Sequence, residues 1–258
     1  MSNLSFSNLA LPDAQLQNLD SLGYVQMTAI QAAALPLALS GNDLIGQAKT
    51  GSGKTAAFAL PLLARLNPQH FSVQSLILCP TRELASQVAD EIRRLARYQP
   101  NIKVVTLCGG QSIGPQIGSL EHGAHVVVGT PGRIKDHLRK ETLSLANVNT
   151  LVLDEADRML EMGFIDDIET IITATPSSRQ TLLFSATYPD NIQSLSARFQ
   201  RAPQRVSVES LHTEQDIAQR FFVCQKSDRL PALVRLLAHF KPQAAVVFCN
   251  TKELVREV

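Results

Sequence analysis

Short apolar runs alternate with longer stretches of helical periodicity from residue 44 onward. The apolar runs predict strands at Leu44–Gln47, Ser75–Pro80, Val104–Cys108, His125–Thr130, Thr150–Asp154, Gln180–Ser185 and Arg205–Val208. Helices are predicted between them, among others at Lys54–Leu66, Arg82–Tyr98 and Asp190–Phe199. Near-continuous apolar strands that alternate with helices are typical of a parallel sheet covered on both faces. The pattern therefore predicts a doubly wound α/β domain.

A polar stretch without clear periodicity, Glu209–Gln215, follows the last of these strands and is typical of a linker. The alternation then restarts with strands predicted at Arg220–Cys224 and Ala244–Cys249, a helix at Asp228–Phe240 between them, and a helix that opens at Thr251. Two strands and short helices are too few to bury a core of their own. We expect a first domain over residues 1–208, a linker over 209–219, and the truncated start of a second domain over 220–258.

Charge and cysteine usage limit the possible classes of protein. The 24 basic and 23 acidic residues give a net charge of +1, so the chain lacks the strongly basic character of a nucleic-acid coat protein. Any contact with nucleic acid must be local.

The four cysteines are far apart and have no metal-ligand spacing, which favours reduced core thiols. No apolar run approaches the ~18 residues of a membrane span, and no secretory signal opens the chain, so we expect a cytoplasmic protein without membrane contact. We also expect a monomer.

A glycine-rich segment follows the first predicted strand and opens a predicted helix. It consists of Ala48, Lys49, Thr50, Gly51, Ser52, Gly53, Lys54 and Thr55. Gly51 and Gly53 allow the backbone to turn its N–H groups toward a phosphate, Lys54 reaches the outer phosphates, and the Thr55 hydroxyl suits Mg²⁺. Ala48 stands where the strict phosphate-loop pattern has glycine. A tight turn without a ligand is the alternative.

Two carboxylates, Asp154 and Glu155, end another apolar run and are predicted to lie at the carboxyl edge of the sheet, where doubly wound folds bind ligands. There Asp154 can hold Mg²⁺, and Glu155 can orient or deprotonate the attacking water. The alternative is a pair of acids that favour a helix N-terminus, which is our interpretation of Asp166 and Asp167.

These two segments resemble those of the DEAD-box ATP-dependent RNA helicases, whose name is spelled by residues 154–157. Further matches follow in the family's order: Pro80–Leu84, Gly109-Gly110, Thr130–Arg133, Ser185–Thr187 and Val246–Thr251. The resemblance implies RecA-like domains, ATP and Mg²⁺ as cofactors, and RNA as partner. It implies catalytic roles for Lys54, Asp154 and Glu155, and it implies that Asp157, Ser185 and Thr187 couple the nucleotide to domain closure. The two hydroxyls could equally be turn-formers.

The resemblance also implies an adenine-recognition segment within residues 1–40, with Phe6, Tyr24 and Gln31 in contact with ATP. A glutamine amide can donate to and accept from the N6 and N7 edge of adenine. Met27 and Ala29 replace two prolines usual in this segment, which alters the stiffness of the loop. The alternative is an exposed helical glutamine.

The expected RNA contacts are Pro80, Thr81, Arg82, Gly109, Gly110, Thr130, Gly132 and Arg133. Guanidinium, hydroxyl and glycine N–H groups bind phosphates and 2′-hydroxyls, so contact should be independent of base sequence. The absence of Trp and an aromatic share of 5% disfavour a base-stacking platform. Arg93, Arg94 and Arg97 have the spacing of a solvated helix face.

The predicted function is ATP hydrolysis coupled to RNA binding and local duplex unwinding. The alternatives are an ATP-gated RNA clamp and a DNA-translocating helicase, which Gln31 and Ala156-Asp157 disfavour. The motifs that supply an arginine finger lie in the part of the second domain that we expect to be missing, so this chain should hydrolyse ATP poorly alone. Residues 93–97 and 106–111 are most similar to a bacterial member that acts in large ribosomal subunit assembly.

Overall fold

The computed structural model describes residues 4–208, 218 and 220–258. The chain divides into two compact units, Met1–Ser210 and Leu211–Val258. The predicted linker, 209–219, lies outside the described residues except for Ala218. Within the described residues, no helix is long and apolar enough to cross a membrane.

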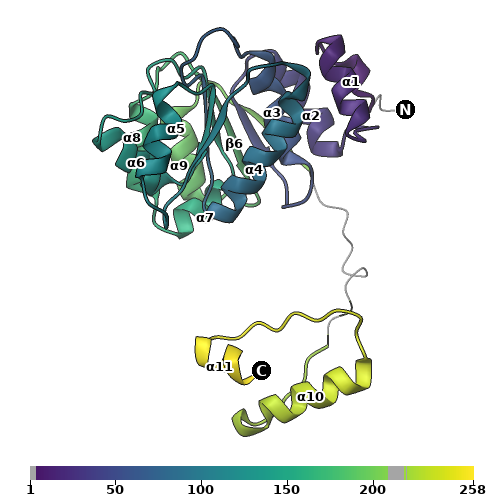
Figure 1. Cartoon of the computed structure of the whole chain (residues 1–258). Helices are drawn as coiled ribbons and strands as arrows, with labels where there is room; N and C mark the ends of the chain where they lie inside the picture. The colour runs from purple at the N-terminus through teal and green to yellow at the C-terminus, as the bar shows by residue number, and fades with distance from the viewer. Residues whose placement is uncertain (1–3, 209–217, 219) are drawn as a thin grey trace. The chain divides into compact units, whose positions relative to one another are not determined.

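The larger unit is built on a sheet flanked by helices (Figure 1). The sheet is parallel and has seven strands in the order β3-β4-β2-β5-β6-β1-β7. The strands are β1 (Leu44–Gln47), β2 (Ser75–Leu78), β3 (Val104–Leu107), β4 (Val126–Gly129), β5 (Thr150–Leu153), β6 (Gln180–Ser185) and β7 (Gln204–Ser207). The predicted fold class is confirmed. Several predicted strands extend one or two residues too far because the polar or turn residues that follow them, such as Pro80 and Asp154, already belong to the loops.

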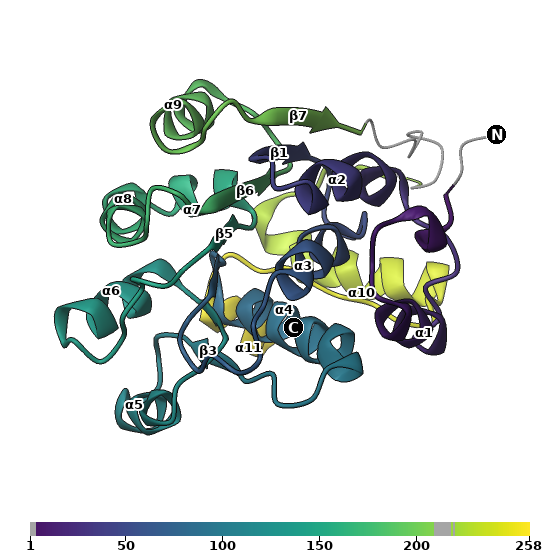
Figure 2. The ribbon, with the colours of Figure 1, turned by 90° about the horizontal axis from the view of Figure 1, so that it is seen from above.

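Helices cover both faces of the sheet (Figure 2). One layer contains α2 (Ala29–Leu39), α3 (Lys54–Ala64) and α4 (Arg82–Leu95), with α1 (Asp13–Ser21) outside it. The other contains α5 (Gly114–Glu121), α6 (Pro131–Arg139), α8 (Ile165–Thr173) and α9 (Asp190–Phe199), and the short α7 (Ala156–Glu161) follows β5. The predicted helix at 82–98 changes to a 3₁₀ turn, Ala96–Tyr98, after Leu95.

Successive strand residues point to opposite layers, as the strand period of two requires. Ile77 packs in the apolar cluster on the α3 side, whereas its neighbours Leu76 and Leu78 pack in the cluster on the α6 side. Both faces of each central strand are therefore buried, which explains why the strands are apolar without alternation.

The strand order determines which loops meet at the carboxyl edge. Strands β5, β6 and β1 are neighbours, so the loops that hold the phosphate segment, Asp154 and Ser185 lie side by side. Strands β3, β4 and β2 are also neighbours, which brings together the loops that begin at Cys108, Thr130 and Cys79. The two predicted sites thus occupy two halves of one sheet edge.

The smaller unit contains a 3₁₀ turn (Lys226–Asp228), α10 (Arg229–Phe240) and α11 (Lys252–Glu257). The strands predicted at 220–224 and 244–249 are wrong, because both segments are irregular. A strand needs a neighbour for its backbone hydrogen bonds and a facing layer for its side chains. None of the described residues in this unit is buried, and Val223 and Phe248 are almost fully exposed.

Candidate nucleotide and RNA sites

A cavity of about 800 Å³ opens where the loop after β1 faces the end of β5 and the segment before α2. Its lining includes seven of the residues predicted to bind ATP: Tyr24, Gln31, Thr50, Gly51, Gly53, Lys54 and Thr55. Asp154 and Glu155 line the same cavity. Ala48, Lys49, Ser52 and Phe6 are not part of the lining. A cavity of this volume accommodates a nucleotide-sized ligand.

The glycines of the phosphate segment are required by their backbone conformation. Gly51 and Gly53 have left-handed φ values of 82° and 94°, which side chains with a Cβ adopt only with strain. A Cβ at Gly53 would also lie 2.5 Å from the Gln31 Nε2 atom and 3.0 Å from the Thr28 hydroxyl. The segment can therefore approach the adenine-recognition segment closely only with glycine at this position.

Lys54 begins α3 and is buried, and its Nζ atom donates to the Ala48 carbonyl at 3.0 Å. The ammonium group is thus held inside the curl of the loop, where phosphate oxygens would lie. Ala48 is buried and its N–H donates to the Ser185 carbonyl at 3.0 Å, which joins the start of the loop to the end of β6.

Asp154 is 3% exposed, and its Oδ1 atom accepts from the Glu155 N–H at 3.0 Å. Burial raises the pKa of the Asp154 carboxyl from 3.8 to about 6, against the opposing effect of the Lys54 charge. No described residue donates a hydrogen bond to Oδ2. A buried carboxylate with an oxygen free toward the cavity, together with the Thr55 hydroxyl, provides the hard oxygen ligands that suit Mg²⁺.

Glu155 has a left-handed φ of 51° at the start of α7. A non-glycine residue in this region is strained, and such outliers cluster at functional sites. Its Oε1 atom accepts from the Thr50 hydroxyl at 3.0 Å, and Oε2 lies 3.9 Å from Nη1 of Arg158. The strained turn therefore directs the Glu155 carboxylate across the cavity toward the phosphate segment.

The predicted coupling residues form one hydrogen-bonded group. The Thr187 N–H and hydroxyl both donate to Asp157 Oδ2 at 2.9 Å, and the Asp157 N–H donates to the Ser185 hydroxyl at 3.3 Å. Partial burial raises the pKa of Asp157, but the hydrogen bonds from Thr187 and Ser185 outweigh it and hold that pKa below its ordinary value. The group links the start of α7 to the end of β6 and the loop that follows it.

The adenine-recognition segment is tied to the phosphate segment by Gln31. Thr28 and Gln31 form a capping box at the start of α2, with the Gln31 Oε1 atom accepting from the Thr28 N–H at 2.9 Å. Gln31 Nε2 donates to the Gly53 carbonyl at 3.1 Å. At 2% exposure, Gln31 is a buried residue and the alternative of an exposed helical glutamine is wrong. Phe6 packs edge-on behind Tyr24, with ring centroids 5.9 Å apart.

A second depression, of about 640 Å³, lies over the other half of the sheet edge. Five predicted RNA contacts line it: Gly109, Gly110, Thr130, Gly132 and Arg133. Arg82 reaches it from α4, because a Cβ on Gly110 would collide with the Arg82 Nη1 atom. Pro80 is buried, and the Thr81 hydroxyl accepts from the Leu84 N–H at 3.2 Å as the cap of α4. We call this depression the phosphate groove.

Several lining residues were not found by motif. Lys135 and Asp167 form an ion pair of 2.7 Å at the phosphate groove, and α6 and α8 supply one member each. Glu91 and Arg94 line the nucleotide cavity, and the Glu91 carboxylate accepts from the Tyr24 hydroxyl. The sequence signal for Arg94 was a run of arginines at helical spacing, which also fits a solvated face. Arg93, Arg94 and Arg97 are all exposed, as a solvated face requires, and Arg94 differs from Arg93 only in that it also lines the cavity.

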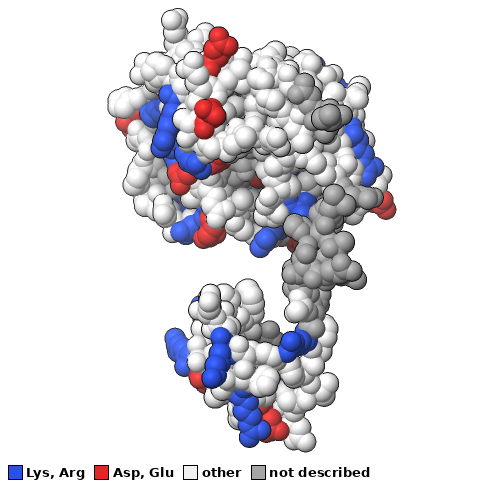
Figure 3. Space-filling model, turned by 90° about the vertical axis from the view of Figure 1, so that its right-hand side faces the viewer, with Lys and Arg blue, Asp and Glu red and all other residues white. Residues whose placement is uncertain are grey.

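Charge on the larger unit is mixed. Figure 3 shows Lys and Arg interspersed with Asp and Glu on a mostly uncharged face. This face therefore has no broad basic field.

Comparisons with known proteins agree with this geometry. The family profile described as DEAD/DEAH box helicase matches residues 28–195. The chain is 55% identical over 250 residues to the ATP-dependent RNA helicase DbpA of Escherichia coli K12, covering 96% of this chain and 55% of that protein. It is 43% identical to the DEAD-box ATP-dependent RNA helicase CshA of Bacillus subtilis, covering 99% of this chain and 52% of that protein.

A crystal structure of a DEAD box protein from the hyperthermophile Methanococcus jannaschii has a similar fold, with a TM-score of 0.78 and 40% identity. That match covers all of this chain and 69% of the archaeal one. The chain thus spans about half the length of the curated relatives that it matches. With a matching family profile, the matching fold and the two sites on one sheet edge, the chain belongs to the DEAD/DEAH box helicase family.

Proposed function

We propose that this chain is the ATP-binding part of an ATP-dependent RNA helicase that couples ATP hydrolysis to RNA binding and local duplex unwinding. The observation that carries the proposal is the convergence of Lys54, Asp154 and Glu155 on one cavity, beside a separate groove lined by Arg133 on the same sheet edge. Two ligands bound to neighbouring loops of one sheet can influence each other through the shared strands.

In the proposed reaction, Lys54 leaves the Ala48 carbonyl and binds the outer phosphates, while the N–H groups around Gly51 and Gly53 surround them. Thr55 and Asp154 would hold Mg²⁺, which when bound neutralises charge that develops on the phosphates. Mg²⁺ favours the ionised form of Asp154, whose pKa burial raises to about 6. Burial thus disfavours the ionised carboxylate, and a bound Mg²⁺ would offset that cost.

Glu155 is proposed to orient and deprotonate the attacking water. Its carboxylate is held toward the phosphate segment by the Thr50 hydroxyl, at 3.0 Å, so it is already directed at the reacting end of the nucleotide. Gln31 is proposed to distinguish adenine from guanine, because its amide lies at the cavity wall and can exchange its bonds to the Gly53 and Thr28 backbones for bonds to the base.

The phosphate groove is proposed to bind the RNA backbone without reading base edges. Arginine, threonine and glycine groups line it, and these suit phosphates and 2′-hydroxyls. The likeness of residues 93–97 and 106–111 to a bacterial member that acts in large ribosomal subunit assembly extends the proposal to ribosomal RNA. We also infer a reducing, cytoplasmic compartment, which the unpaired Cys79, Cys108, Cys224 and Cys249 support.

The test is nucleotide turnover with RNA and with DNA of the same sequence, on this chain and on a longer form of about the relatives' length. RNA should stimulate ATP hydrolysis in the longer form and DNA should not. Glu155→Gln should lower turnover by about 10²- to 10⁴-fold, the usual size of a general-base effect, while Mg·ATP still binds. Equal stimulation by DNA would contradict an RNA-directed function, and a longer form that binds RNA only with ATP but separates no duplex would favour a clamp.

A further inference from the structure

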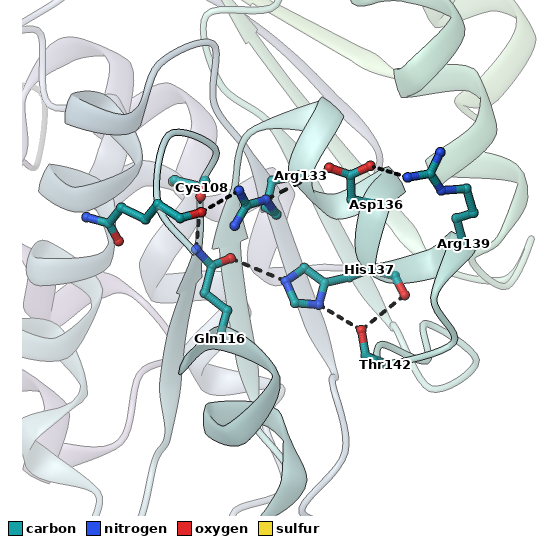
Figure 4. Close-up of polar contacts among 8 residues, drawn as sticks. Cys108, Gln116, Arg133, Asp136, His137, Arg139 and Thr142 are labelled. Carbon is teal, nitrogen blue, oxygen red and sulfur yellow. Dashed lines mark hydrogen bonds and ion pairs between the residues drawn. The ribbon is translucent and has the colours of Figure 1, made fainter. Parts of the chain in front are cut away.

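The loop Cys108–Gln111 is held at one end by a side chain of α6 and at the other by a side chain of α5. The Arg133 Nη2 atom donates to the Gln111 carbonyl at 2.8 Å. At the other end, Gln116 Nε2 on α5 donates to the Cys108 carbonyl at 2.9 Å, and Gln116 Oε1 lies 3.2 Å from Nε2 of His137 (Figure 4). Arg133 and His137 are four residues apart on α6 and therefore share one face of that helix.

His137 is fixed in turn by Thr142, three residues after the end of α6. The Thr142 hydroxyl lies 2.8 Å from His137 Nδ1 and 3.3 Å from the His137 carbonyl. Because the Gln116 amide nitrogen donates to Cys108, its oxygen faces the ring, so His137 Nε2 carries the hydrogen and Nδ1 accepts from Thr142. His137 is fully buried, and burial, with Arg133 nearby and Asp136 opposing, lowers its pKa. The imidazole is a neutral link between two hydrogen bonds.

The loop between these anchors carries the groove-lining glycines. Gly110 has a left-handed φ of 75° and lies directly against the Arg82 guanidinium. Nε and Nη1 of Arg133 are buried and have no hydrogen-bond partner among the described residues, although Nε lies 4.0 Å from a carboxylate oxygen of Asp136, and the Arg133 side chain is 10% exposed at the edge of the groove. Guanidinium donors that make no hydrogen bond are groups that an anionic oxygen can satisfy. A small displacement of the loop would move Gln111, and with it Arg133.

We propose that His137 is a positioning residue for RNA: through Gln116 it fixes the Cys108–Gln111 loop, and the fixed loop holds Arg133 and Gly110 in place for a backbone phosphate. The inference rests on the proposed function, because it assigns RNA as the ligand of the groove. His137 itself does not line the groove.

The chain offers a matched control in His125, which is also fully buried but precedes β4 at the opposite edge of the sheet. Its ring accepts from the Lys103 N–H at 3.0 Å and bonds the Pro68 carbonyl at 3.1 Å. His125→Leu and His137→Leu thus remove the same side chain from equally buried sites. Only His137→Leu disconnects the loop.

The experiment measures the affinity of each variant for a fluorescein-labelled single-stranded RNA of ten nucleotides, by anisotropy, together with Mg·ATP affinity. His137→Leu should weaken RNA binding by about 3- to 30-fold, the range expected for a residue that acts through another. His125→Leu should stay within about twofold, and both variants should keep their Mg·ATP affinity. His137→Gln, whose amide can replace the ring N–H toward Gln116, should restore most of the RNA affinity.

Two further readouts separate positioning from loss of fold. The ¹⁵N order parameters of Gly109 and Gly110 should fall from about 0.85, the value of rigid backbone, in His137→Leu but not in His125→Leu. The double variant His137→Leu/Gln116→Leu should bind RNA no more weakly than the weaker single variant, since both act along one path.

The outcomes distinguish this inference from the proposed function. If the unsubstituted chain does not bind RNA, the proposed function fails and the inference fails with it. If it binds RNA but His137→Leu binds equally well, or His125→Leu is weakened to the same extent, or the double variant is additive, the inference alone is overturned.

Discussion

Two equally buried aspartates lie at opposite edges of the same sheet and differ in their partners. Asp43 immediately precedes β1 and is 4% exposed, and Asp154 immediately follows β5 and is 3% exposed. Asp43 accepts from the Thr181 N–H at 2.8 Å and from the Arg201 N–H at 2.7 Å, one donor for each oxygen. Among the described residues, Asp154 accepts only from the neighbouring Glu155 N–H. Burial alone therefore does not distinguish a structural carboxylate from a functional one, whereas an unpaired oxygen does.

Substitution of Asp43, at the sheet edge formed by the amino ends of the strands, should reduce stability most. Asp43→Asn turns an acceptor into an N–H₂ donor that faces the N–H of Thr181 or Arg201, so a buried pair of donors is left without an acceptor. We expect a loss of about 2–4 kcal/mol in the free energy of unfolding, the cost of hydrogen bonds to a charged group together with an unsatisfied donor. Urea unfolding of Asp43→Asn beside the unsubstituted chain measures it. Unchanged stability would show that Asp43 is not the anchor described here.

Substitution of Asp154, at the sheet edge formed by the carboxyl ends of the strands, should instead increase stability. Asp154→Asn keeps the oxygen that accepts from Glu155 N–H and removes a buried charge whose pKa is raised to about 6. In the absence of Mg²⁺ and nucleotide, the variant should be more stable at pH 8 by about 1–3 kcal/mol, since two pKa units correspond to about 3 kcal/mol. The same urea experiment in the presence of a chelator tests this. Destabilisation by this isosteric change would contradict it.

The gain from Asp154→Asn should depend on pH. A carboxyl whose pKa is raised on folding binds its proton more tightly in the folded state, so its contribution to stability is present below the unfolded pKa and is lost as pH rises through the folded pKa. The stability difference between the variant and the unsubstituted chain should therefore be near zero at pH 4 and grow until about pH 7. A difference that is constant over this range would assign the gain to something other than the charge.

The smallest effects should come from the two ends of β6. Thr187→Val removes a hydroxyl that donates to Asp157 at 2.9 Å and should cost about 1 kcal/mol of stability. Thr181 lies at the amino end, and its hydroxyl is buried without a partner among the described residues, so Thr181→Val should be neutral or stabilising. Equal losses in the two valine variants would show that the threonine side chain matters for packing and not for the Asp157 hydrogen bond.

Much of the larger unit could be predicted from sequence because its strands are apolar on both faces and its loops carry short motifs. Asp154 could be placed because it ends an apolar run, and Gln31 because its segment resembles the family's adenine-recognition segment. The partners of Asp43 could not be predicted, because Thr181 and Arg201 come from segments more than a hundred residues away. The role of His137 could not be predicted either, because its contact with Gln116 depends on how α5 and α6 pack.

In the smaller unit, the sequence predicts strands that the structure does not contain. Residues 220–224 and 244–249 have the composition of buried strands, but a strand exists only where a neighbour supplies its hydrogen bonds, and composition cannot report the neighbour.

Phe6, in the larger unit, is an intermediate case. Its sequence position was informative, but the structure places it in the core behind Tyr24 and not in the lining of the cavity.

The most direct test of the account is a calorimetric titration of the chain with ATP, with and without Mg²⁺, beside Asp154→Asn and Asp43→Asn at a temperature where all three are folded. The account predicts that Asp154→Asn loses at least about tenfold in affinity for Mg·ATP but not for ATP alone, and that Asp43→Asn matches the unsubstituted chain. If Asp154→Asn bound Mg·ATP as tightly as the unsubstituted chain, the free oxygen at the carboxyl edge would not be the site of the ion.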